Sequence, residues 1–279
     1  MAKSIAELRK MAEMGVFTHS GSFHADDVLS AALLCVAGVI DNPYKINRVN
    51  QPQEGCLGLC FDVGLGDYDH HQKTGFKVRN GDPSRKYAAF GLLWNEIGEE
   101  VLIRYGASPE AAKIGKEYFD KRFVEPTDLT DNFGPDTYPN TFNYMVSCQI
   151  PIDGSSDETT NAFYQLVQWM LPIFSQMITS VVSYATKIQI AQELGTEKVV
   201  VIRDGERFLP AACFKGTNAQ FIVSKSNRAD QWNVNAVPPH LFKLEKADMK
   251  GCVFQHTAKF ISAFDTLDNA IAAANLNVE

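Results

Sequence analysis

The apolar positions at the start of the chain follow first a helical and then a continuous pattern. Ile5, Leu8 and Met11, three residues apart, predict an amphipathic helix. A short apolar run over 16–18 predicts a strand, and a longer one over 28–39 predicts a second helix. The chain therefore opens with a strand-loop-helix unit.

Polar residues gather where these elements join. Asp26 and Asp27 stand where a helix N-terminus favours carboxylates. A second short strand is expected over 57–63, followed by the loop GDYDHHQKTG over 66–75. Because ligands of open α/β sheets collect at the carboxyl ends of strands, both polar segments are expected at one edge of a sheet.

The middle of the chain has mainly helical patterns. Helices are expected at about 87–105, 109–123 and 158–193, the last bent or broken at Pro172. The acidic stretch VEPTDLTDNFG, 124–134, follows the second of these helices. We place it among the loops and strand ends that carry the polar residues.

The pattern changes after residue 195. Runs over 198–202 and 207–214 flank an Asp-Gly turn and predict a hairpin. Further strands are expected at 220–224, 233–237 and 251–256, then a helix over 266–274. We predict an α/β fold in two domains, a parallel-sheet domain over 1–195 and a smaller α+β domain over 196–279.

Composition narrows the function. With 279 residues, 45% of them hydrophobic, the chain can bury one large core or two ordinary ones. Its 33 acidic against 26 basic residues give a net charge of −7, which disfavours wrapping long duplex nucleic acid. A nucleotide or a short nucleic-acid end remains compatible with this charge.

Cysteine usage and the N-terminal segment predict a cytoplasmic location. The six cysteines are scattered and form no C-x-x-C pair, and the start of the chain lacks the apolar core of a signal peptide. The most apolar long segment, about 162–190, contains several glutamines, serines and threonines. We expect it to be a helix of a soluble core rather than a membrane span.

Four of the six histidines fall in two of the polar segments, His19…His24-x-Asp26 and Asp69-His70-His71. Taken one by one, these residues and Asp62, Asp128 and Asp131 could be helix caps, turn residues or solvated loop residues. Together they form a set of imidazoles and carboxylates without a thiolate. Such a set suits Mn²⁺, Fe²⁺ or Mg²⁺ better than structural zinc.

The order of these segments resembles the DHH phosphoesterase superfamily, which includes RecJ-type exonucleases, oligoribonucleases and manganese-dependent family II pyrophosphatases. Within it, the stretches FTHSGSFHADDVLSAALL, CFDVG, YDHHQ, FVEPTDLTDNFG and GCVFQHTAKFISAF are similar to the MYG exonuclease family. The resemblance runs from about residue 16 to the C-terminus. It implies a DHH-like catalytic domain with two divalent cations, Mn²⁺ foremost and Mg²⁺ or Fe²⁺ as alternatives.

The resemblance also implies roles for individual residues. The implied metal ligands are His19, His24, Asp26, Asp62, His70 and Asp131. His24 takes the place of the usual middle aspartate of the first motif, and Asp62 is expected to bridge both ions. Asp131, followed by Asn132, fits the fourth motif better than Asp128. In the third motif, Asp69 is the partner that fixes ring orientation, and His71 faces the scissile phosphate.

The C-terminal stretch departs from the family pattern. Family members commonly have Gly-Phe-Ile-Gly-Gly-His where this chain has KFISAF, 259–264. His256 and Lys259, with Trp232 or Arg228, are candidates for substrate contacts, although their pattern favours the ordinary interpretation as strand-end and surface residues. The missing glycines and histidine leave the substrate class open.

Three functions compete. The leading one is a divalent-metal-dependent phosphoesterase, an exonuclease or oligonucleotide hydrolase that uses a water activated by two metals. The second is a pyrophosphatase or nucleotide phosphohydrolase, and the third is a metal-stabilised binding protein without turnover. We expect a short nucleic acid or nucleotide as substrate and no membrane partner, and the sequence leaves a homodimer open.

Overall fold

The computed structural model describes residues 3–72, 75–203 and 209–279. They divide into two compact units, Met1–Ala185 and Thr186–Glu279. The predicted boundary at 195/196 falls just after α7, Ser156–Leu194, whereas the division lies within this helix. The helix is not broken at Pro172, and it continues past Ala185, so its residues belong partly to each unit.

Unit 1 is built around a small parallel sheet. Its strands are β1 (Val16–His19), β2 (Ile46–Val49) and β3 (Leu59–Cys60), in the order β2-β1-β3. Val16 pairs with Ile46 on one side and with Leu59 on the other, and both pairings are parallel. All three strands therefore end at the same edge, as expected for the predicted α/β domain.

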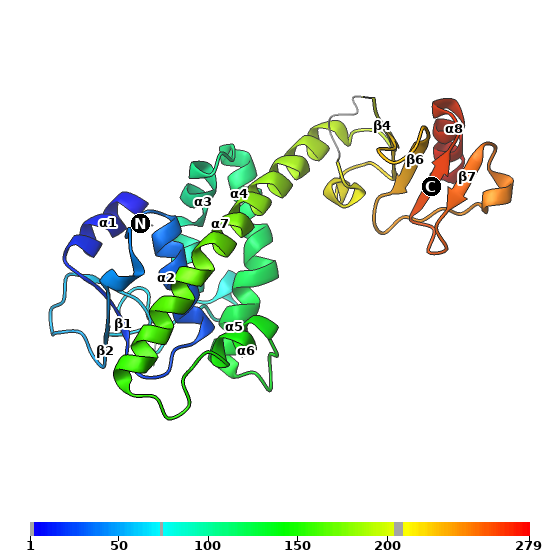
Figure 1. Cartoon of the computed structure of the whole chain (residues 1–279). Helices are drawn as coiled ribbons and strands as arrows, with labels where there is room; N and C mark the ends of the chain where they lie inside the picture. The colour runs from blue at the N-terminus through cyan, green and yellow to red at the C-terminus, as the bar shows by residue number, and fades with distance from the viewer. Residues whose placement is uncertain (1–2, 73–74, 204–208) are drawn as a thin grey trace. The chain divides into compact units, whose positions relative to one another are not determined.

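Helices surround this sheet and supply most of the core of unit 1 (Figure 1). Figure 1 labels α1 to α7 at Ile5–Glu13, Ala25–Val36, Ala89–Arg104, Pro109–Phe119, Glu125–Phe133, Thr141–Ser147 and Ser156–Leu194. A π-helical turn, Asp120–Val124, joins α4 to α5 without a break. Short 3-10 helices lie at Pro43–Lys45 and Arg79–Gly81. Phe90, Trp94 and Phe174 are among the largest fully buried side chains.

By length and composition, α7 alone among the described helices could cross a membrane. An 18-residue window in it has a mean hydropathy of 1.3, and 33% of that window is buried. This is weak support for a span, because core helices of soluble proteins have the same property. Phe163, Val167 and Phe174 on α7 are fully buried in the core of unit 1, and we interpret α7 as a core helix.

Unit 2 contains a five-stranded mixed sheet and one long helix. The strands, in the order β4-β5-β6-β8-β7, are Val199–Ile202, Phe221–Lys225, Trp232–Ala236, Ile261–Phe264 and Cys252–Gln255. Helix α8 (Leu267–Asn277) contributes Ala270 and Ala274 to a core with Phe221, Val223 and Phe264 of the sheet. Short 3-10 helices lie at Ala211–Phe214 and Lys246–Asp248. The predicted second, smaller α+β domain is confirmed.

Two local predictions are wrong. The predicted hairpin does not form, because β4 pairs in parallel with β5 and Ala211–Phe214 is a 3-10 helix; its turn lies among residues 204–208, outside the described residues. The stretch 124–134 is not a loop but mainly helix α5, in which Pro126 occupies the first turn, where its missing N–H is harmless. The sequence patterns also missed β2 and β8.

Candidate metal centre

Asp62 follows the end of β3 in a conformation that few non-glycine residues adopt. Its φ is 53°, in the left-handed region, and its side chain is buried. Its main-chain N–H donates to the carbonyl of Tyr68, which ties the strand end to the loop carrying His70. Backbone strain of this kind is commonly kept where a side chain must be aimed at a functional site. Here it holds the carboxylate at the carboxyl edge of the sheet.

A first cluster forms where β1 leads into α2. His19 ends β1, and His24 is the N-cap of α2. The Nε2 atom of His19 lies 2.8 Å from Oδ2 of Asp27, and that same oxygen accepts a hydrogen bond from the His24 main chain at 2.9 Å. His19, His24 and Asp27 each offer one ligand atom to a group that could hold a metal ion.

A second such group consists of Asp26, His70 and Asp131. The Nε2 atom of His70 lies 3.1 Å from Oδ2 of Asp131, which comes from helix α5. Asp26 is fully buried, and its two carboxylate oxygens accept hydrogen bonds from the main-chain N–H groups of Ala89 and Phe90 at the start of α3. Asp26 thus anchors one helix to another while facing the cluster.

Asp62 lies between the two groups. Its Oδ2 is 3.4 Å from Nε2 of His19, and its Oδ1 is 3.0 Å from Nε2 of His70. Nδ1 of His24 also lies 3.7 Å from Oδ1 of Asp131, which links the groups a second time. The six sequence-predicted ligands therefore converge at one place, although Asp131 reaches it from a helix rather than from a loop.

The buried carboxylates of this cluster stabilise positive charge beside them. Burial raises the pKa of Asp131 to about 6, with a further contribution from Asp62, and it also raises the pKa of Asp26. Burial alone would lower the pKa of His19, but Asp27 and Asp62 raise it to about 11; for His70, Asp62, Asp26 and Asp131 raise it to about 10. The carboxylates thus retain protons on both imidazoles in the absence of another cation.

The donor set fits a divalent cation by a second criterion. Among the described residues, Oδ1 of Asp62 and Nε2 of His70 are buried without a partner in hydrogen-bond geometry, although only 3.0 Å separates them. Buried polar atoms are normally satisfied, and unsatisfied ones frequently mark a site for an ion or water. Oxygen and imidazole ligands without thiolate suit Mn²⁺, Fe²⁺ or Mg²⁺.

His71 is more exposed than its neighbour His70, although both face Oδ1 of Asp62, with Nδ1 of His71 at 3.4 Å and Nε2 of His70 at 3.0 Å. These three residues form a third group that could hold a metal ion. The side chain of His71 is 59% exposed, against 8% for His70. Asp69 accepts a hydrogen bond from the main chain of His71 and lies 2.8 Å from its Nδ1, and this contact raises the pKa of His71. The ring that Asp69 orients is therefore that of His71.

Asp128 has a different environment from Asp131, one turn further along α5. It is fully buried, 2.6 Å from the guanidinium of Arg79, and it accepts a hydrogen bond from the main chain of Gly91 at 3.1 Å. A Cβ atom at position 91 would approach the Asp128 carboxylate to 1.8 Å, so this contact requires glycine. Asp128 is outside the metal-type groups of the described residues.

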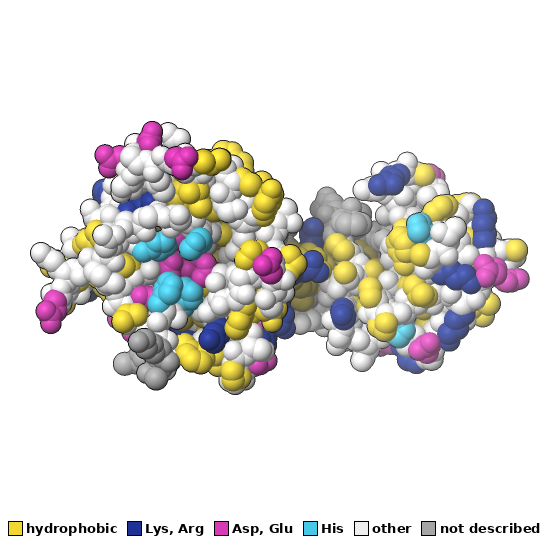
Figure 2. Space-filling view, turned by 90° about the horizontal axis from the view of Figure 1, so that it is seen from below, with side chains coloured by type: hydrophobic (Ala, Val, Ile, Leu, Met, Phe, Trp, Pro, Cys, Tyr) yellow, Lys and Arg dark blue, Asp and Glu magenta, His cyan; other side chains and the backbone are white. Residues whose placement is uncertain are grey.

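These clusters border an open cleft in unit 1. Figure 2 shows histidine side chains surrounding acidic ones on one face of this unit. The cleft has a volume of about 450 Å³, and its lining includes His19, His24, Asp62, Asp69 and His71. Ser22, Asn50 and Gln51 add uncharged polar groups to its wall. Pockets of this size accommodate ligands as large as a nucleotide.

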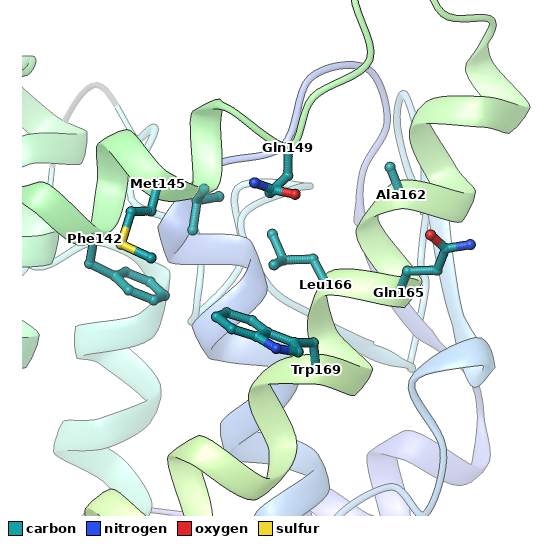
Figure 3. A pocket seen from close by; sticks show the side chains of 8 residues that line it. Phe142, Met145, Gln149, Ala162, Gln165, Leu166 and Trp169 are labelled. Atoms are coloured by element: carbon teal, nitrogen blue, oxygen red, sulfur yellow. The ribbon is translucent and has the colours of Figure 1, made fainter.

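A second pocket, between α6 and α7, has a more apolar lining. Figure 3 shows Phe142 and Met145 of α6 opposite Leu166 and Trp169 of α7, with Gln149 at the end of α6. Its volume is about 460 Å³, and it shares no lining residue with the cleft of the metal-type groups.

The candidate substrate residues of unit 2 do not lie together. His256 and Lys259 belong to the turn between β7 and β8, where Lys259 has φ 54° and pairs with Glu245. Arg228 lies in the turn between β5 and β6, and Trp232 begins β6. Because β5, β6, β8 and β7 alternate in direction, these two turns fall at opposite edges of the sheet.

Comparison with known proteins identifies the family. The family model for MYG1 exonucleases, described as "Uncharacterised protein family (UPF0160)", matches residues 15–246. This chain belongs to that family. The resemblance inferred from the motifs is thereby confirmed.

Curated relatives match nearly the whole chain. MYG1 exonuclease of Rattus norvegicus is 26% identical over 325 residues, covering 95% of this chain and 84% of the relative. MYG1 exonuclease of Homo sapiens is 26% identical over 324 residues, covering 95% and 85%. The MYG1 protein of Schizosaccharomyces pombe is 25% identical over 315 residues, covering 93% and 95%.

A solved structure, RecJ in complex with Mn²⁺ from Thermus thermophilus, is 14% identical and covers 98% of this chain and 53% of its own, with a TM-score of 0.30.

Sequence reasoning missed two residues of the centre. The sequence predicts Asp27 as a helix cap; its Oδ2 accepts from the His24 main chain as expected, but the same oxygen also faces His19. The sequence gives Asn132 no role of its own, yet its side chain contacts His70 at 3.3 Å. The sequence signal for both residues is their position directly beside a predicted ligand, Asp27 after Asp26 in HADD and Asn132 after Asp131 in TDN. Neighbouring residues at the start or end of a helix can contact the same cluster of side chains.

Proposed function

We propose that this chain is a divalent-metal-dependent phosphoesterase, acting as an exonuclease or oligonucleotide hydrolase. The observation that carries the proposal is the position of Asp62, whose two carboxylate oxygens face two separate imidazole-carboxylate groups. Such an arrangement is what a pair of cations sharing one carboxylate requires. The names of the curated relatives, MYG1 exonuclease, support the same class of reaction.

Each group has a proposed part. His19, His24 and Asp27 would hold one ion, and Asp26, His70 and Asp131 the other, with Asp62 shared. Bound cations of this kind supply a nucleophilic water at neutral pH and neutralise phosphoryl charge. We assign Mn²⁺ to this role first, with Mg²⁺ or Fe²⁺ as the alternatives.

His71 would act on the substrate directly. Asp69 holds its Nδ1 side, and the ring lines the cleft. A protonated imidazole there donates a hydrogen bond to a phosphoryl oxygen as negative charge develops on it. The hydrogen bond to Asp69 raises the pKa of His71 and so stabilises the protonated ring.

The cleft favours a small substrate. About 450 Å³ beside the acidic groups accommodates a nucleotide unit, and the net charge of −7 disfavours broad contact with a nucleic-acid duplex. We therefore propose the end of a single strand or a short oligonucleotide as substrate. The same cleft size keeps a pyrophosphatase or nucleotide phosphohydrolase as the second candidate.

The cytoplasm remains our proposed location, because the six cysteines are not joined in disulfides. We assign contacts with the rest of the substrate to His256 and Lys259.

The test is hydrolysis by the purified full chain with added Mn²⁺, Mg²⁺ or Fe²⁺, or with none. The panel contains RNA and single-stranded DNA labelled at either end, dinucleotides and pyrophosphate. Asp62→Asn serves as the inactive variant. Asp67→Asn is the matched control, because Asp67 lies on the same loop but is exposed and pairs with Lys3.

We expect metal-dependent shortening of the labelled strands from one end, lost in Asp62→Asn and kept in Asp67→Asn. Cleavage of pyrophosphate alone would favour the second candidate. Tight metal binding without hydrolysis of any panel member would favour a binding protein and refute the enzyme proposal.

A further inference from the structure

The two ring nitrogens of His70 face different partners, one inside the candidate metal centre and one outside it. Its Nε2 faces the carboxylates, 3.0 Å from Oδ1 of Asp62 and 3.1 Å from Oδ2 of Asp131. Its Nδ1 faces away from them, 3.3 Å from Oδ1 of Asn132. The side chain is 8% exposed, so there is little room for water to replace either partner.

The amide of Asn132 is held in one orientation. Its Nδ2 donates hydrogen bonds to the carbonyl of Asp128 at 2.9 Å and to the carbonyl of Tyr87 at 3.2 Å. Both partners can only accept, so turning the amide over would replace two hydrogen bonds by two oxygen-oxygen contacts. Its oxygen must therefore face His70.

An amide oxygen can only accept a hydrogen bond, which determines the proton position on His70. The contact requires the proton of a neutral His70 ring to be on Nδ1. The lone pair is then on Nε2, the nitrogen directed at Asp62 and Asp131, where a cation would bind. Partners on the far nitrogen of a histidine ligand are known to fix both tautomer and ring orientation.

We propose that Asn132 is a positioning residue for His70: it accepts the Nδ1–H hydrogen bond and thereby presents Nε2 as a metal ligand. This inference rests on the proposed function, because it assumes that His70 binds a cation. It assigns Asn132 to His70, whereas Asp69 serves His71. The adjacent histidines thus have separate supporting residues.

The main variant is Asn132→Ser. A serine in a helix can still bond the carbonyl one turn earlier, here that of Asp128, but its short side chain does not reach His70. Asn132→Ala, which removes both contacts, is the second variant. Thr130→Val is the matched control. Thr130 lies on α5 like Asn132, and its hydroxyl donates to the carbonyl of Tyr138 at 2.7 Å.

The measurement is the Kd for Mn²⁺ by calorimetry, with thermal unfolding in EDTA as the check on folding. We expect Asn132→Ser and Asn132→Ala to weaken Mn²⁺ binding about 10–100-fold, as for other partners of metal-bound histidines. Thr130→Val should leave the Kd within about twofold, since removing its hydroxyl affects stability but no group that faces His70.

A double-mutant cycle with His70→Ala separates positioning from a general structural role. If Asn132 acts through His70, adding Asn132→Ser to His70→Ala changes the Kd less than about twofold. If Asn132→Ser weakens Mn²⁺ binding as much in the His70→Ala background as in the wild type, the inference is overturned. Asn132 would then affect the Kd through α5 or Asp131 and not through His70. Wild-type Mn²⁺ binding by Asn132→Ser, with binding weakened in His70→Ala, would also overturn it and leave the proposed function intact. Unchanged binding in His70→Ala itself would refute the metal site.

Discussion

The two sheets carry similar polar residues with different results. In unit 1, β1 and β3 run in the same direction, so His19 at the end of β1 meets Asp62, just beyond β3, at 3.4 Å. In unit 2, the antiparallel strands send the turn with Arg228 and the turn with His256 to opposite edges. In this protein the parallel strands bring His19 and Asp62 to one edge, whereas the antiparallel strands place the two turns of unit 2 at opposite edges.

Two buried polar residues, Asn277 of unit 2 and Asp62 of unit 1, differ in how their side-chain atoms are satisfied. In unit 2, Asn277 is buried and uses both ends of its amide, accepting from the main chain of Lys243 and Leu244 and donating to Ala273. In unit 1, Oδ1 of Asp62 is buried and lacks such a partner within the described chain. A fully satisfied group stabilises a fold, whereas an unsatisfied one is available to a ligand.

The largest effect is expected from Asp62→Asn, which tests whether Asp62 is a metal ligand. This substitution keeps the size of the side chain and removes the negative charge that faces both groups. We expect turnover to fall by at least about 10³-fold, because both candidate ions lose a ligand. Metal content and rate are measured together. Asp265→Asn in unit 2, an exposed aspartate, should change neither; a similar loss in both variants would contradict the contrast.

Arg79→Ala tests whether Asp128, unlike Asp131, serves the fold. It would leave the fully buried Asp128 without its ion pair, at a cost of about 3–5 kcal/mol in the free energy of unfolding. Urea unfolding in EDTA measures it. Arg85→Ala is the control: its pair with Glu125 is more exposed, so about 1 kcal/mol or less is expected. Equal costs would show that the buried pair has no special structural role.

His71→Ala distinguishes the adjacent histidines of unit 1. Because His71 is assigned to the substrate, we expect turnover to fall about 10²–10³-fold with metal content unchanged. Metal analysis of the purified variant, beside its rate, is the measurement. Metal loss equal to that of His70→Ala would make His71 a ligand, and full activity would make the exposed ring a bystander.

The pH dependence of Mn²⁺ binding should report on His19 and His70. Without metal, their pKa values are raised to about 11 and about 10, so at pH 7 both rings carry protons that a cation must displace. Affinity should therefore rise with pH, about tenfold per pH unit for each proton released. The metal-free stability contributed by these raised pKa values has the opposite sign, present below pH 6.5 and lost as the pH rises toward 10–11.

Calorimetry at pH 7 and pH 8 in buffers of different ionisation enthalpy counts the protons released. Release of none would mean that the imidazoles are neutral before binding or take no part in it.

Much of the fold could be predicted because its signals are local. Periodicity located α1, α2, α3 and β1 to within a few residues. The hairpin after β4 was wrong because β5, from further along the chain, takes the place beside β4. Helix α5 was missed because its acidic, proline-containing sequence is stabilised by tertiary contacts such as Asp128 with Arg79.

The site could be predicted in part for the same reason. His19 ends β1, Asp62 follows β3 and His70 lies on the loop after β3, and parallel strands bring such positions together. The hydrogen bonds that the start of α3 donates to Asp26 could not be foreseen, since 63 and 64 residues separate the partners. The support of His70 by Asn132, 62 residues away, was hidden likewise.

Lys259→Ala tests whether unit 2 contacts the substrate, and of all the variants it should have the smallest effect on the kinetics. Lys259 is part of an exposed ion pair with Glu245, which contributes little to stability, so the variant should fold normally. If the β7–β8 turn contacts substrate, losing one charge that does not face the reacting phosphate raises KM by about tenfold or less and leaves kcat unchanged, the mark of uniform binding. Lys225→Ala is the control and should leave KM unchanged, because Lys225 ends β5 at the opposite edge of the sheet and belongs to an ion pair with the exposed Asp230. Initial rates over a range of oligonucleotide concentrations measure both, and equal KM values for the wild type and the two variants would remove the substrate role from this turn, leaving catalysis and recognition together at the parallel sheet of unit 1.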